Sequence, residues 1–230
     1  MADKLTLAPA TRHAFDRLVQ DVVRVFGPRF VALVASGTHS SVAFTSDIRP
    51  GDLEALAALR ETWRHDGLDT PLLLTPHEFR RSLDAFPLEY QAIVDRHVVI
   101  AGEPPFVDLV FDPQQLRRAC EVQAKGHLIH LRQGWIEAGG HDADLIALIR
   151  RSAAPLRALL TNVARLGPAA AQDSDLAALG ARIAGLDGAL IHEILAVETT
   201  PESARHLVRR LSDYVAVTEQ LWAFVDSWAA

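Results

Sequence analysis

Several features that would narrow the function of this 230-residue chain are scarce in its sequence. Cysteine occurs once, at Cys120, which excludes an intrachain disulfide and a zinc site built on several cysteines. Because Cys120 lies in a helical, apolar pattern, we expect it to be a buried small hydrophobic residue. Basic residues are outnumbered, 23 to 29, by acidic ones, and the net charge is −6. We therefore expect no broad surface for nucleic acid.

Long apolar runs are also missing. No segment approaches the roughly 20 apolar residues that a membrane-spanning helix requires, so we expect no membrane partner. Residues 1–6 carry no basic stretch followed by an apolar one, which is the pattern typical of a secretory signal. These absences together favour a cytoplasmic location.

Apolar side chains are abundant, at 49% of all residues, which is enough for a sizeable core. In the first half they follow both helical and strand-like spacings. The helical spacing predicts helices over 11–26 and 52–65, and two shorter helices between 75 and 94. Strands are predicted over 29–35, 41–48, 71–75 and 97–101. We expect Asp52 and Thr75 to be N-caps, and we interpret Arg49-Pro50-Gly51 as a break.

From Asp112 onward the spacing of apolar residues is helical. Helices are predicted over 112–138, 141–166, 175–197 and from 200 to near the end of the chain. Asp112 is the expected N-cap of the first of these. Pro155 lies inside the second, and we expect it to kink or interrupt that helix.

The order of these elements predicts the fold class. Strands mixed with helices, followed by a run of helices, are typical of an α+β domain joined to a helical bundle. We predict an α+β domain over residues 1–108 and an all-α four-helix-type bundle over residues 109–230.

One combination of elements resembles the nucleotidyltransferase superfamily. It consists of a helix, an apolar strand that ends in the small-residue turn Ser36-Gly37-Thr38, and an acid, Asp47, about eleven positions further on. Residues 71–90, 97–103 and 117–140 are similar to a bacterial branch in which a helical region follows the domain. The resemblance covers most of residues 10–166 and implies a nucleotidyltransferase-like fold for the first half.

The resemblance also implies a chemistry. In that superfamily a Gly-Ser turn approaches a nucleoside triphosphate, and an Asp-x-Asp pair with a third carboxylate holds Mg²⁺. Here the turn is reversed to Ser36-Gly37, and Arg49, which cannot ligate Mg²⁺, occupies the position of the second acid. Pro50-Gly51 cuts the strand short, and residues 71–74 supply no third carboxylate. We therefore predict a degenerate active site with Asp47 as the catalytic remnant and no metal site.

The remnant still contains a polar loop after a strand. Ser36, Gly37 and Thr38, together with Arg49, are the candidate nucleotide-binding residues, because backbone donors in such a loop can cradle a phosphate. The alternative is an ordinary turn, with Arg49 paired locally with Asp47 or Asp52.

The helical half contains two further candidates. His127 and His130 lie three residues apart on one helix face, where a metal site would need a carboxylate from a neighbouring helix; the alternative is a pair of surface or groove histidines. Phe224 and Trp228 lie four apart on a second face of the last helix and favour a homo-oligomer through the bundle. Their alternative is a better-buried C-terminal helix.

Three functional hypotheses follow. The preferred one is a catalytically degenerate nucleotidyltransferase-like protein with a binding or assembly role, as a homo-oligomer or a scaffold for a small-molecule or nucleotide ligand. The second is an active nucleotidyltransferase that modifies a small molecule or protein, with Mg²⁺ and a nucleoside triphosphate as cofactors, and with its acids supplied by Asp47 with Asp52 or Glu54. The third is a metal-binding helical bundle.

Overall fold

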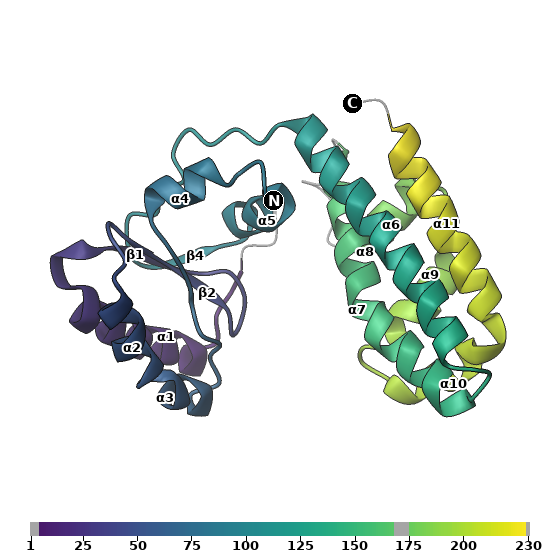
Figure 1. The fold of residues 1–230 in the computed structure, drawn as a ribbon, viewed down its shortest axis with the longest axis horizontal. Helices are drawn as coiled ribbons and strands as arrows, with labels where there is room; N and C mark the ends of the chain where they lie inside the picture. Colours follow the sequence, from purple (N-terminus) through teal and green to yellow (C-terminus); the bar gives the residue numbers. More distant parts are fainter. Residues whose placement is uncertain (1–4, 168–174, 229–230) are drawn as a thin grey trace. The chain divides into compact units, whose positions relative to one another are not determined.

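A computed structural model describes residues 5–167 and 175–228, whose contacts divide the chain into one compact unit up to Phe111 and a second from Asp112 (Figure 1). The first unit is a mixed sheet with helices, and the second is mostly helical. This arrangement confirms the predicted order of an α+β part followed by a helical part. The predicted boundary, between residues 108 and 109, lies just before the division.

The sheet of the first unit has the strand order β3-β2-β1-β4. β1 (Phe30–Ala35) is antiparallel to both β2 (Ser41–Thr45) and β4 (Val98–Gly102), whereas β3 (Leu72–Leu74) is parallel to β2. The four predicted strands are therefore present. β2 ends at Thr45, earlier than predicted, so Asp47 and Arg49 follow the strand and are not part of it.

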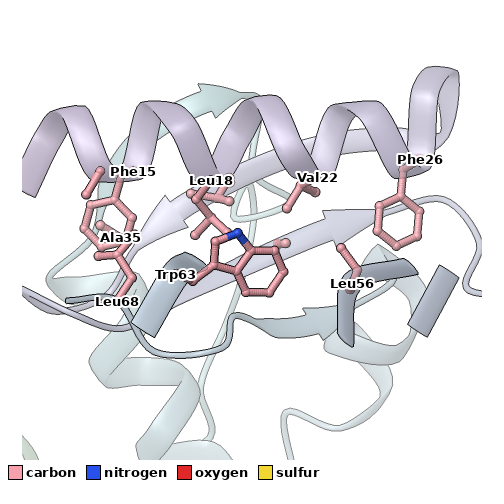
Figure 2. Close-up of a cluster of buried hydrophobic side chains, with 11 residues drawn as sticks. Phe15, Leu18, Val22, Phe26, Ala35, Leu56, Trp63 and Leu68 are labelled. Atoms are coloured by element: carbon pink, nitrogen blue, oxygen red, sulfur yellow. The ribbon is translucent and has the colours of Figure 1, made fainter. Parts of the chain in front are cut away.

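One face of the sheet is covered by α1 (Pro9–Phe26), α2 (Pro50–Ala57) and α3 (Arg60–His65). A 3-10 turn, η1 (Gly27–Arg29), joins α1 to β1. Figure 2 shows the apolar stripe of α1 directed toward Trp63 and the sheet, with the buried side chains Phe15, Leu18, Val22 and Phe26. Burying each such side chain stabilises the unit by roughly 1.5–3 kcal/mol.

The opposite face of the sheet is covered by α4 (Pro76–Arg81) and α5 (Pro87–Asp95). Phe79 from α4 meets Phe44 of β2 edge-to-face, with 5.4 Å between ring centroids. The predicted N-cap at Thr75 is confirmed, because its hydroxyl accepts the backbone N–H of Glu78. With helices on both faces, β1 and β2 bury apolar side chains on both sides.

Residues 49–65 differ from the prediction. α2 begins at Pro50 with Arg49 as its N-cap, so the predicted break at 49–51 and the predicted N-cap at Asp52 are wrong. Proline suits the first helical position because its missing N–H needs no partner there. Asp52 is the third residue of the helix, and its carboxylate accepts the backbone N–H of Arg49 at 2.8 Å. The predicted single helix is also two helices, since α2 ends at Ala57 and α3 begins at Arg60.

The second unit is built on the long helices α6 (Pro113–Glu137), α7 (Asp142–Leu166) and α11 (Leu211–Ser227). Asp112 caps α6 as predicted, by accepting the backbone N–H of Gln114. The helix α6 packs against both α7 and α11, and α7 also contacts the shorter helices. These are α8 (Leu176–Ile183), α9 (Gly188–Ala196) and α10 (Ala204–Leu207).

Two predicted helices of the helical region are wrong. The predicted helix 175–197 is interrupted between α8 and α9, where Gly185 has φ 66° and Asp187 caps the next helix. The predicted helix from residue 200 is broken by the 3-10 turns η3 (Pro201–Ser203) and η4 (Val208–Arg210) on either side of α10. Pro155 does not interrupt α7, which is continuous to Leu166, so of its two predicted effects only the kink stays a prediction.

Other expectations about single residues can also be compared with the structure. Cys120 is fully buried on α6, as expected. Phe224 and Trp228 are half-buried and contact each other edge-to-face, with 4.9 Å between ring centroids. Among the helices of the described residues, none is both long and apolar enough to cross a membrane.

Candidate functional site

The candidate phosphate loop connects β1 to β2 and is closed by its own backbone. The N–H groups of Ser36 and Gly37 both donate to the carbonyl of Ser40, at 3.0 and 3.3 Å. His39 ties the loop to the segment before β3, because its ring nitrogen lies 2.8 Å from the carbonyl of Gly67. Thr38 is exposed at the tip of the loop. The two N–H groups at the start of the loop are therefore already hydrogen-bonded.

The remnant acid Asp47 lies after β2 in a cluster of ion pairs. Arg49 Nε lies 2.7 Å from Asp47 Oδ2, so the local pair weighed from the sequence is present. Arg29 meets Asp52 with both guanidinium nitrogens, at 2.6 and 2.7 Å. Arg29 lowers the pKa of Asp52 to about 2, against the opposing effect of burial. Each of the two carboxylates is thus neutralised by an arginine.

The strand register separates these two groups of residues. Ala35 pairs with Ser41 at one end of the β1–β2 hairpin, and Phe30 pairs with Thr45 at the other. The loop 36–40 follows the first end, whereas Asp47 and Arg49 follow the second. With a rise of about 3.4 Å per residue, the two ends are roughly 14 Å apart. The structure therefore does not bring Ser36, Gly37 and Thr38 together with Asp47 and Arg49.

These residues do not fit the Mg²⁺ and nucleoside triphosphate that the resemblance implies. A magnesium site needs carboxylate oxygens that are free to face the ion, together with the phosphates of the nucleotide. Here Asp47 and Asp52 face the cations Arg49 and Arg29, and the phosphate loop lies at the opposite end of the hairpin. In the described residues, no three His, Cys, Asp or Glu side chains gather as a metal site would require.

An open cavity lies between α6 and α7, with a volume of about 460 Å³. Its walls are mostly apolar and come from both helices. His127 and His130, singled out in the sequence, both line it, so they are groove histidines. Sequence reasoning missed the other polar side chains of its lining, Gln123, Arg151 and Ser152.

The wall of this cavity continues into a buried chain of hydrogen bonds. Ser152 Oγ donates to the carbonyl of Ile149 at 2.9 Å, so the Ser152 oxygen is free to accept from the Tyr214 hydroxyl at 3.1 Å. The single proton of Tyr214 is then used, and its oxygen accepts from His127 Nε2 at 3.2 Å. His127 is therefore the tautomer with the proton on Nε2 and a lone pair on Nδ1.

Burial sets the charge of this histidine. It lowers the pKa of His127 to about 4, with a smaller contribution from the neighbouring His130. Burial also raises the pKa of Tyr214 well above its ordinary value. Both groups are neutral at pH 7, so the chain from His127 to Ser152 is an uncharged polar wall at the side of an apolar cavity.

The sequence did contain a signal for this cavity. Gly126 and Pro155 are both unfavourable inside helices, and both line the cavity from opposite helices. Residues that break a local preference without a packing reason often mark functional positions.

No protein-family model, curated protein or solved structure matches this chain.

Proposed function

We propose that this protein has a binding or assembly role, with a first unit that is nucleotidyltransferase-like but does not transfer nucleotides. The resemblance in residues 10–166 supports a nucleotidyltransferase-like first unit. The ion pairs of Asp47 with Arg49 and of Asp52 with Arg29 support the loss of nucleotide transfer. A carboxylate that already neutralises an adjacent arginine is a poor ligand for Mg²⁺, and the arginine repels the ion.

Calorimetry with ATP, with and without Mg²⁺, tests the loss of transfer chemistry. We expect no metal-dependent binding at micromolar concentrations for the natural chain. We expect the same for Arg49→Asp, which restores the Asp-x-Asp pattern, because the loop at Ser36 stays at the far end of the hairpin. Metal-dependent micromolar binding to the natural chain would overturn the proposal. A gain of such binding in Arg49→Asp alone would show that the loop at Ser36 lies close enough to residue 49 to share a nucleotide with it.

An exposed apolar stripe on α6 favours the assembly role. Val122, Ile129 and Ile136 are 72%, 48% and 81% exposed and follow one another at seven-residue intervals. Such residues share one helix face, and that spacing is typical of helices that pair with each other. We therefore propose that a homo-oligomer forms through α6, in place of the Phe224–Trp228 face expected from the sequence, because those two rings are half-buried against each other.

Sedimentation equilibrium at micromolar protein tests this assembly. We expect a mass above one subunit for the natural chain and one subunit for Ile129→Glu. Val110→Glu is the matched control, because Val110 is an exposed apolar residue outside α6. A single-subunit mass for the natural chain would rule out the oligomer at these concentrations.

A further inference from the structure

Two residues that are unfavourable inside helices, Gly126 and Pro155, line the cavity between α6 and α7. Gly126 lies in the interior of α6, yet a Cβ placed on it would have no atom of another element within 4 Å. By comparison, a Cβ on Gly134 of the same helix would lie 2.5 Å from the end of the Leu148 side chain, which would have to move. Gly126 has no such neighbour, and the space beside it is the cavity that Pro155 lines from α7.

The size and lining of the cavity match a small amphipathic molecule. At about 30 Å³ for each water-sized group, its volume of about 460 Å³ holds roughly ten to fifteen non-hydrogen atoms. Ligand cavities are typically apolar with a few polar groups that orient the ligand. Here the apolar part is formed by the side chains Leu131, Leu148, Pro155, Ala158 and Leu159.

The charge around the cavity points to an anionic head group. Arg151 is exposed, lines the cavity and forms no ion pair within the described part of the chain, like Arg150 beside it, which does not line the cavity. None of the described side chains that line the cavity is acidic. The other polar groups are the neutral His127, the exposed His130, Gln123 and Ser152, so Arg151 offers one positive charge to one negative charge.

We propose that this cavity binds a small monocarboxylate with an apolar body of about eight to twelve carbons, whose head group pairs with Arg151. The planar guanidinium matches a carboxylate with two parallel hydrogen bonds, and these are among the stronger polar interactions in proteins. A phosphate would bring nearly two negative charges to this one arginine. The inference rests on the binding role proposed above, but not on the lost transfer chemistry of the first unit.

Calorimetry with octanoate, 1-octanol and octyl phosphate tests the head group and the cavity separately. We expect octanoate to bind once per chain and about tenfold or more tightly than octanol, because hydrogen bonds to charged groups contribute more than neutral ones. Arg151→Gln removes this difference and leaves octanol binding unchanged. Arg150→Gln is the matched control, since Arg150 is exposed on the same helix and does not line the cavity. Ala158→Phe fills the cavity and abolishes binding of both molecules.

Several outcomes would overturn the proposal. They are no octanoate binding up to millimolar concentration, equal affinities for octanoate and octanol, tighter binding of octyl phosphate, or unchanged octanoate binding in a folded Arg151→Gln or Ala158→Phe variant. Circular dichroism establishes that each variant is folded. If Ala158→Phe changes the sedimenting mass while the natural chain binds no octanoate, the cavity is an interface between copies. Binding of Mg²⁺ and ATP would contradict the proposed loss of transfer chemistry and leave this inference standing.

Discussion

The half-buried His127 makes the stability of the helical unit dependent on pH, in a direction that its pKa fixes. Its pKa is about 4 in the folded protein and 6.5 in a solvated chain. The groups that face it are Tyr214 from α11, Arg151 and Ser152 from α7, and His130 on its own helix, none of which is acidic. A protonated His127 would therefore have no carboxylate partner in the described structure.

The direction in which the free energy of unfolding changes with pH follows from the number of protons bound in each state. Between about pH 6.5 and 4 the unfolded chain holds one proton more at His127 than the folded protein does, so the free energy of unfolding falls as the pH falls. Below about pH 4 both states are protonated and this contribution to the slope ends. At about 1.36 kcal/mol per pH unit, the difference between the two pKa values corresponds to roughly 3 kcal/mol.

Replacing His127 by glutamine isolates this effect. The glutamine amide keeps a donor for Tyr214 but does not titrate, so we expect His127→Gln to be nearly as stable as the natural chain at pH 7. At pH 4 we expect it to be more stable than the natural chain by roughly 3 kcal/mol. Urea unfolding followed by tryptophan fluorescence measures this, because most of the tryptophans lie in the helical unit, at positions 135, 222 and 228.

His192→Gln is the control for this experiment, since His192 is exposed on α9. We expect its stability to change with pH as that of the natural chain does. Parallel stability curves for His127→Gln and the natural chain between pH 7 and pH 4 would refute the reasoning. They would mean that His127 is protonated in the folded protein, and that the neutral hydrogen-bond chain to Ser152 is incorrect.

Two more changes test the packing and the ion pairs. Gly180→Ala would place a Cβ 2.0 Å from the carbonyl of Leu160, so we expect urea unfolding to show a free energy of unfolding lower by about 1–3 kcal/mol. Gly126→Ala has open space around its Cβ, and we expect it to raise that free energy by up to about 1 kcal/mol. Equal effects of the two changes would contradict the packing described here. Asp52→Asn removes the partner of Arg29, and we expect a lower melting temperature at pH 7. Because the folded pKa of Asp52 lies below its ordinary value of 3.8, its contribution is present above that pH and is lost as the pH falls toward 2. The difference in melting temperature should shrink over that range, and a constant difference would show that the ion pair does not matter.

The sequence by itself determined the local elements of this protein. The apolar stripe of α1, the buried strands and the caps at Thr75 and Asp112 depend on residues that are neighbours along the chain. Spacing and capping chemistry are therefore visible in the printed sequence. The local rules failed where a proline is compatible with two conformations, as at Pro50, which begins a helix in place of the predicted break.

The candidate site depended on contacts that no local pattern contains. The sequence drew attention to His127 and His130, but Tyr214 reaches His127 from 87 positions away along the chain. Similarly, Asp52 reads as a cap and in the fold is the partner of Arg29, 23 positions earlier. Local sequence patterns cannot show such pairs, because contacts between residues far apart in the chain are set by the packing of whole helices and strands.

The strand register made the largest difference to function. The resemblance to the nucleotidyltransferase superfamily implies that Ser36 and Asp47, eleven positions apart, are two parts of one nucleotide site. An antiparallel hairpin returns the chain along its own path, so residues before and after β2 lie at opposite ends of the sheet. Only the tertiary structure could show that these residues are separated, and that residues distant in sequence come together around the α6–α7 cavity.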